Sequence, residues 1–180
     1  MYFDKFIGID WSGDKNNFQK GISVAECIKG NKVPQIVKPL NNKYWTRTTL
    51  IEWLYKEIKS QRNLIGFDFA FSYPFYDRCS YFPGIKDSPI NSEKLWKLIE
   101  DTNTNTKNFY GGEIWASKTY GKFFNSPKLK GSHFASRRRC TERFAKKKIL
   151  SPSPTFNCVG PGAVGTGTLA GMRILNLLKN

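Results

Sequence analysis

The sequence predicts an α/β domain built on a mixed β-sheet that is flanked by helices. Two observations support this fold class. Short apolar runs separated by turn-forming residues fill the start of the chain, and a segment of helical period then leads into another apolar run. A strand that follows a helix in this way pairs parallel to an earlier strand, whereas strands joined by tight turns are antiparallel. With 180 residues, 39% of them hydrophobic, we expect a single domain that spans residues 1–180.

The first three predicted strands form an antiparallel meander. Residues 3–10 are an apolar run that predicts the first strand, and the Gly-, Asp- and Asn-rich residues 13–17 predict the turn after it. Residues 18–28 form the expected second strand and residues 33–37 the third. Pro34 places the third strand at an edge of the sheet, because proline has no N–H to donate to a neighbouring strand.

A helix and a fourth strand follow the meander. Residues 46–61 carry apolar side chains at helical spacing, and Thr48 or Thr49 is the expected N-cap. The apolar residues 64–69 then predict a fourth strand. As the product of a crossover connection, this strand should lie parallel to the first and beside it.

The second half of the chain predicts helices joined by long loops. Ser92 is the expected cap of the first of them, and residues 150–154 predict an extended segment. Residues 109–134 are rich in glycine and aromatic residues without a clear period, and they yield no prediction. The predicted helices are residues 93–99, 137–148 and 164–178.

Composition restricts the class of protein. Twenty-nine Lys and Arg residues against 14 Asp and Glu give a net charge of +15, which favours a polyanionic partner, most simply a nucleic acid. No apolar run approaches the ~20 residues of a membrane span, and the acidic start of the chain does not resemble a signal peptide. One histidine and four scattered cysteines argue against a zinc site, so we expect reduced thiols and a cytoplasmic location.

Two aspartates are the leading candidates for a catalytic site. Asp10 and Asp68 each end an apolar strand, and adjacent parallel strands would bring them together at one edge of the sheet. Two neighbouring carboxylates repel each other unless they share a cation, so we expect a Mg²⁺ or Mn²⁺ site. Glu52, in the predicted helix 46–61, is the expected additional ligand. The alternative is that Glu52 is a surface residue paired with Lys56 one turn later.

A basic segment is the candidate nucleic-acid-binding surface. Lys and Arg dominate residues 118–148, which contain one acid, Glu142. Aromatic residues interleave with these cations and could stack on bases, as in proteins that bind single strands. The alternative is a solvated basic face whose aromatic residues belong to the core. The predicted contacts to nucleic acid are Arg137, Arg138, Arg139, Arg143, Lys146, Lys147 and Lys148.

The glycines before the last predicted helix match G-x-G-x-x-G through Gly160, Gly162 and Gly165. A plain tight loop is the first interpretation. A phosphate held by the N–H groups at the helix start is the second. Dinucleotide binding is a distant third, because no room follows for the strand that carries the ribose-binding acid.

Three segments of the chain resemble a family of predicted nucleases with a ribonuclease H-like fold, the domain of unknown function 429 family. They are Gly8-Ile9-Asp10-Trp11-Ser12-Gly13, residues 65–74, and a C-terminal block that contains residues 139–142, 151–152 and 159–172. The resemblance implies a metal-dependent nuclease site around Asp10 and Asp68. Glu142 would be a further acid or a structural partner of Arg139. Family members continue into another strand and helix that bring a further acid, so the fold is expected here in a form truncated at the C-terminus.

Three functions remain open from the sequence. The first is a metal-dependent nuclease that hydrolyses phosphodiester bonds of DNA or RNA. The second is a nucleic-acid-binding domain of the same fold without catalysis. The third is a phosphotransferase of the actin and sugar-kinase type, although 180 residues hardly hold the two duplicated domains that such enzymes need.

Overall fold

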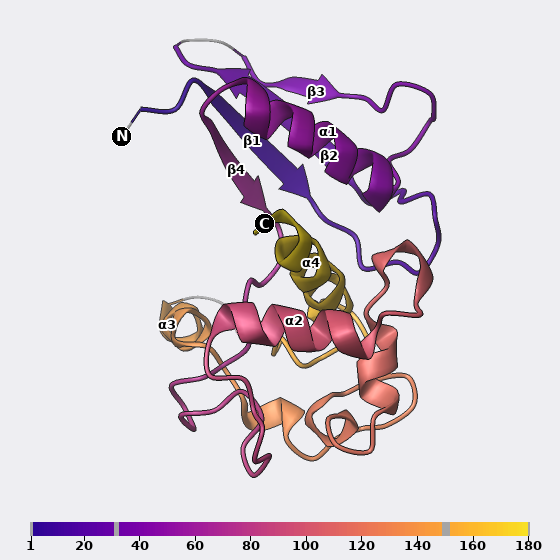
Figure 1. Ribbon diagram of the computed structural model, residues 1–180. Helices are drawn as coiled ribbons and strands as arrows, with labels where there is room; N and C mark the ends of the chain where they lie inside the picture. Colours follow the sequence, from indigo (N-terminus) through magenta and orange to yellow (C-terminus); the bar gives the residue numbers. More distant parts are fainter. Residues whose placement is uncertain (1, 31–32, 149–151, 180) are drawn as a thin grey trace. The chain divides into compact units, whose positions relative to one another are not determined.

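The computed structural model describes residues 2–30, 33–148 and 152–179 (Figure 1). Within it the chain forms two compact units, Met1–Asp68 and Phe69–Asn180. The prediction that residues 1–180 make one domain stays a prediction. Residues 150 and 151 of the expected extended segment lie outside the described residues.

The N-terminal unit is built on a four-stranded mixed sheet. Its elements are β1 (Lys5–Asp10), β2 (Ser23–Ile28), β3 (Gln35–Val37), α1 (Arg47–Ser60) and β4 (Asn63–Phe67). The strand order is β3-β2-β1-β4, with β1 and β3 antiparallel to β2 and with β4 parallel to β1. The α/β class and the meander with a parallel fourth strand are therefore confirmed, as is the edge position of the third strand.

The second strand is shorter than the predicted residues 18–28, because it begins only at Ser23. The loop before it is held by a buried side chain. Arg47 donates its Nη2 to the carbonyl oxygens of Ser12 at 2.6 Å and Asp14 at 2.9 Å. These bonds satisfy backbone acceptors that would otherwise need a strand partner.

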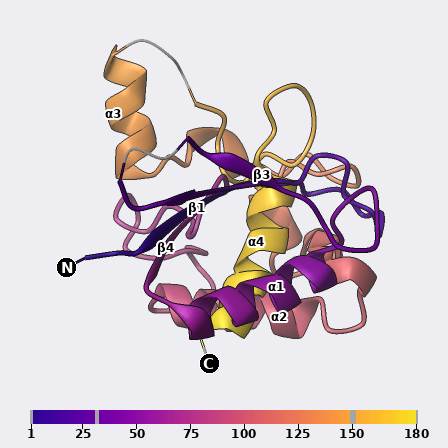
Figure 2. The same ribbon diagram turned by 90° about the horizontal axis from the view of Figure 1, so that it is seen from above.

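The two faces of this sheet differ in their cover. Three alternate side chains of β1 are buried, namely Lys5, Ile7 and Ile9. Helix α1 lies against one face of the sheet (Figure 2). Its Leu50 and Leu54 are buried there. An ion pair of 2.8 Å between Lys5 Nζ and Glu57 Oε2 joins the strand to the helix. The other face of β1 carries exposed residues, and α1 does not cover it.

The N-cap of helix α1 is Thr46, two or three residues before the predicted cap. Thr46 Oγ1 accepts from the Thr49 N–H at 3.0 Å, and Thr49 Oγ1 accepts from the Thr46 N–H at 3.1 Å. This reciprocal pair is a capping box that satisfies two helix-end donors. The expectation that Thr48 or Thr49 is the cap was wrong, because Thr49 acts as the third helical residue of the box.

The C-terminal unit is helical with long connections. Its α-helices are α2 (Ser92–Thr102), α3 (Cys140–Lys148) and α4 (Gly165–Leu178), and its short 3₁₀ turns are Lys107–Phe109, Gly112–Ala116, Gly121–Phe123 and Phe134–Ser136. Asn91 caps α2 in place of Ser92, because its Oδ1 accepts from the Lys94 N–H at 2.9 Å. Among the described residues no helix is long and apolar enough to span a membrane.

Aromatic rings fill the core of the C-terminal unit. Tyr73 stacks on Phe156 with ring centroids 4.2 Å apart, and the buried rings of Phe82, Phe123 and Phe124 surround this pair. For Phe123 and Phe124, the alternative that the aromatic residues of the basic segment belong to the core is therefore confirmed. Buried rings cannot stack on bases.

Candidate active site

Asp10 and Asp68 lie side by side at one end of adjacent parallel strands. Asp10 is the last residue of β1, and Asp68 directly follows β4. Ile9 pairs with Phe67, and the Asp68 N–H donates to the Ile9 carbonyl oxygen at 2.9 Å, so the ladder continues to the aspartates. Neighbouring strands lie about 4.8 Å apart. The sequence-based expectation that the topology brings these residues together is met.

The two aspartates also share a face of the sheet. Each lies two residues after an exposed glycine of its strand, Gly8 and Gly66, which are register partners. Because side chains alternate between faces along a strand, Asp10 and Asp68 project from the face that α1 leaves open. This face has a shallow hollow of about 600 Å³, lined by both aspartates and both glycines.

Neither carboxylate has an ion-pair or hydrogen-bond partner within the described ranges, although the chain has a large excess of cations. Other acids do find partners. Glu57 pairs with Lys5 at 2.8 Å, and Asp77 pairs with Arg137 at 2.5 Å. Two like charges about 5 Å apart repel by roughly 1 kcal/mol when fully solvated and more at lower dielectric. A cation held between the two carboxylates would relieve this repulsion.

The donor set of this pair fits Mg²⁺ or Mn²⁺. Both are hard ions that take carboxylate oxygens and keep several waters, so two protein carboxylates suffice. Ser23 places a hydroxyl group beside this pair, because it is the antiparallel register partner of Asp10 and lines the same hollow. No sequence motif marks Ser23 as a site residue, since only the register of β2 against β1 places it there. No group of three His, Cys, Asp or Glu residues that could hold a metal exists among the residues that the structure describes.

Glu52 does not join the aspartate pair. It is an exposed residue of α1, and α1 lies on the opposite face of the sheet from Asp10 and Asp68. The alternative of a surface residue agrees with this position. The assignment of Glu52 as a ligand has no geometric support.

Glu142 is buried at the start of α3 and pairs with Arg139. Its Oε2 accepts from the Arg139 N–H at 2.7 Å, and its Oε1 accepts from Arg139 Nε at 2.9 Å. A glutamate that reaches back to the residue before the helix satisfies an exposed helix-end donor. Of the two roles expected for Glu142, the structure supports the structural partner.

Arg137 was predicted to contact nucleic acid, and this is wrong because the side chain is buried. It binds Asp77 through two donors, Nε to Oδ2 at 2.5 Å and Nη2 to Oδ1 at 2.9 Å. It also donates to the carbonyl oxygens of Pro74, Ser80 and Tyr81 at 2.7, 3.0 and 3.1 Å. With 2% of its surface exposed, Arg137 ties two loops together and cannot reach a polyanion.

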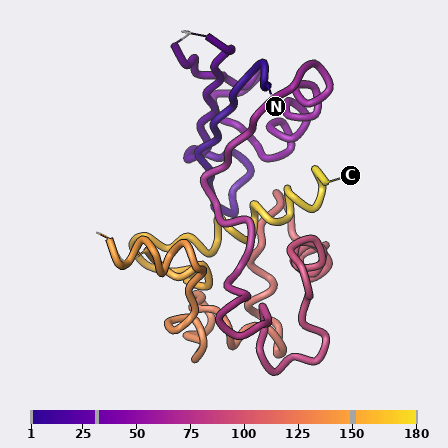
Figure 3. Tube along the Cα trace, turned by 90° about the vertical axis from the view of Figure 1, so that its left-hand side faces the viewer, coloured from indigo at the N-terminus to yellow at the C-terminus, as the bar shows by residue number. Residues whose placement is uncertain are grey.

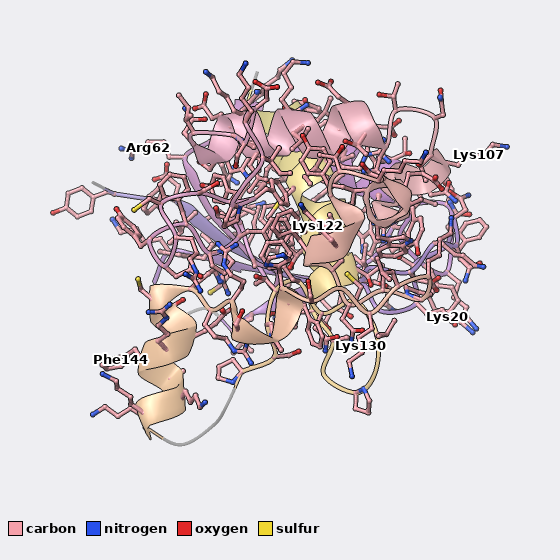
Figure 4. All side chains as sticks on the ribbon, turned by 90° about the horizontal axis from the view of Figure 1, so that it is seen from below. Lys20, Arg62, Lys107, Lys122, Lys130 and Phe144 are labelled. Carbon is pink, nitrogen blue, oxygen red and sulfur yellow. The ribbon has the colours of Figure 1, made fainter. Side chains whose placement is uncertain are left out.

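The other predicted cations are more accessible. Arg138, Arg139 and Arg143 border a hollow of about 390 Å³ beside residues 72–77. Arg143, Lys146, Lys147 and Lys148 are exposed on α3, which lies at the margin of its unit (Figure 3). Phe144 points outward from the same helix (Figure 4). The basic helix is therefore an open surface that a polyanion can approach.

Backbone conformation and close packing explain the glycines of the loop before α4. Gly160 and Gly162 have φ of +86° and +70°, the left-handed region that favours glycine. At Gly165 a Cβ would come within 2.6 Å of the Asn157 carbonyl oxygen and of Cys158 Sγ. The plain-loop interpretation therefore accounts for all three glycines, and the phosphate cradle stays a prediction.

Comparisons with known proteins give no further guide to the function. No protein-family model, no curated protein and no solved structure matches this chain. The assignment of a function therefore depends on the geometry of the aspartate pair and of the basic surface.

Proposed function

We propose that this protein is a metal-dependent nuclease that hydrolyses phosphodiester bonds of DNA or RNA. The observation that supports the proposal most is the aspartate pair. Asp10 and Asp68 are exposed on one face, at the same end of adjacent parallel strands, without a cation partner among the described residues. The strand order β3-β2-β1-β4 and the resemblance to the domain of unknown function 429 family support a ribonuclease H-like identity, which is part of the proposal.

In this mechanism the chain holds the ion and the substrate. Asp10 and Asp68 would hold Mg²⁺ or Mn²⁺ with their carboxylate oxygens, and the Ser23 hydroxyl, which lines the same hollow, would donate a hydrogen bond to a phosphate oxygen of the substrate. When bound, such an ion would supply an activated water and neutralise charge on the phosphate. The exposed cations of α3 would attract the nucleic acid electrostatically, so the affinity for DNA or RNA should fall as the salt concentration rises.

A cleavage assay tests the proposal. End-labelled single- and double-stranded DNA and RNA are incubated with Mg²⁺, with Mn²⁺ and with EDTA. We expect cleavage that needs the metal and that Asp10→Asn and Asp68→Asn each abolish. Glu93→Gln is the matched control, because Glu93 is an exposed acid in the first turn of α2. Cleavage that survives in both aspartate variants would refute the assignment.

A second candidate is a nucleic-acid-binding domain of the same fold without catalysis. The observation that favours it is the absence of a third metal-binding acid beside the pair among the described residues. This function predicts salt-sensitive binding of DNA or RNA with no metal-dependent cleavage by the wild-type protein. The same assay distinguishes the two candidates.

A further inference from the structure

Two glycines lie side by side on adjacent strands in the interior of the N-terminal sheet. Gly8 of β1 and Gly66 of β4 are register partners on the open face. Glycine in the interior of a strand weakens the strand, because it costs more conformational entropy and offers no side chain to pack. Such a glycine therefore calls for a reason, which is commonly backbone conformation, internal packing or the close approach of a ligand.

The fold itself does not require either glycine. Neither has the positive φ that other glycines of this chain adopt. A Cβ at Gly8 would meet nothing within 4 Å, and a Cβ at Gly66 would meet only the Ile7 carbonyl oxygen at 3.9 Å. By contrast, a Cβ at Gly171 would lie 2.4 Å from the Phe69 ring. Approach of a ligand is the remaining reason.

The two glycines form the floor of a trench across the strands. Asp10 and Asp68 follow them on one side. Phe6 and Leu64, which are register partners with 41% and 47% of their surfaces exposed, precede them on the other. Alternate residues of a strand are about 7 Å apart, so the two rows of side chains stand about 13 Å from each other. One row is apolar and the other is acidic.

We propose that this Gly8–Gly66 trench holds one unpaired nucleotide of a single-stranded nucleic acid. The base lies flat on the glycine floor against the Phe6 ring, and its phosphate lies toward Asp10 and Asp68. The net charge of +15 favours a polyanion over an apolar peptide as the occupant. A base can lie on this floor only when its face is free, which is so in a single strand and not in a stacked duplex. The position of the phosphate rests on the proposed nuclease function.

The test fills the trench without disturbing the fold. Gly8→Val and Gly66→Val add side chains where space is open, and valine favours strands, so thermal stability should be kept or raised. Gln35→Val is the matched control. Gln35 is exposed on β3 and is the register partner of Glu26. Glu26 forms an ion pair with Lys5, which lies on the face that α1 covers, so Gln35 lies on that face too.

Binding is measured by fluorescence anisotropy of labelled single-stranded DNA and RNA, with Ca²⁺ in place of Mg²⁺ to prevent turnover. We expect each trench variant to bind about fivefold to a hundredfold more weakly, the range that stacking of one base spans. Gln35→Val should bind as the wild type does, and an unlabelled duplex should compete poorly. Wild-type affinity in both folded trench variants, or equal competition by the duplex, would overturn the proposal.

The trench and the nuclease proposal fail in different ways. If the trench variants cleave and bind normally while Asp10→Asn abolishes cleavage, the trench is wrong and the nuclease stands. If the trench variants lose binding while Asp10→Asn cleaves as the wild type does, the nuclease assignment is wrong. In that second outcome the trench stands as a binding site for a base.

Discussion

Replacing Arg137 by glutamine should destabilise the C-terminal unit. The exposed charges of α3 stay unchanged, because Arg137 precedes this helix. The substitution leaves the Asp77 carboxylate without its bidentate partner. Only 5% of the Asp77 side chain is exposed, so water cannot readily replace that partner. The substitution also removes the donors to the carbonyl oxygens of Pro74, Ser80 and Tyr81. Breaking a buried ion pair on one side costs about 3–5 kcal/mol, so we expect the free energy of unfolding to fall by that amount.

The assay compares Arg137→Gln with Arg143→Gln, a change of the same chemistry on the exposed face of α3. Urea unfolding followed by tryptophan fluorescence should show a loss for Arg137→Gln and a change within about 0.5 kcal/mol for Arg143→Gln. Salt-dependent binding to DNA should show the reverse, with the salt slope reduced by about one only for Arg143→Gln. Equal stability of the two variants, or a reduced slope for a folded Arg137→Gln, would refute the structural role of Arg137.

Three further predictions follow from the contacts. In calorimetry, Mg²⁺ should raise the melting temperature of the wild type but not that of the Asp10→Asn, Asp68→Asn double variant. An equal rise in the two proteins would mean that the ion binds elsewhere. Burial opposes the charge of Lys5, but hydrogen bonds to two glutamates outweigh this and raise its pKa above the ordinary 10.5. The stability that Lys5 contributes should therefore be complete below pH 10.5 and lost as pH rises through the raised pKa; alkaline unfolding of Lys5→Met, which lacks this group, should show no such loss. Burial raises the pKa of the Cys158 thiol to about 12. A thiol reagent at pH 8 should therefore modify the exposed Cys79 quickly and Cys158 only after unfolding. Rapid labelling of both thiols would contradict the burial of Cys158.

The N-terminal unit was largely predictable because its signals are local. Apolar runs, turn residues and a change to helical period specify strands and a helix through neighbouring residues alone. The crossover rule then places the fourth strand beside the first, and with it Asp10 beside Asp68. The errors in the strand and helix assignments of this unit are boundaries, such as the start of β2 at Ser23, where the distant Arg47 binds the backbone of the preceding loop.

The sequence by itself therefore determined the mixed sheet and the meeting of its two aspartates. The tertiary structure decided which charges are available. Arg137 and Asp77 are 60 residues apart in the chain, so no local pattern could separate this buried cation from the exposed Arg143. The place of Ser23 beside Asp10 likewise depends on strand register. Burial and pairing arise from contacts between distant segments, and those contacts exist only once the chain has folded.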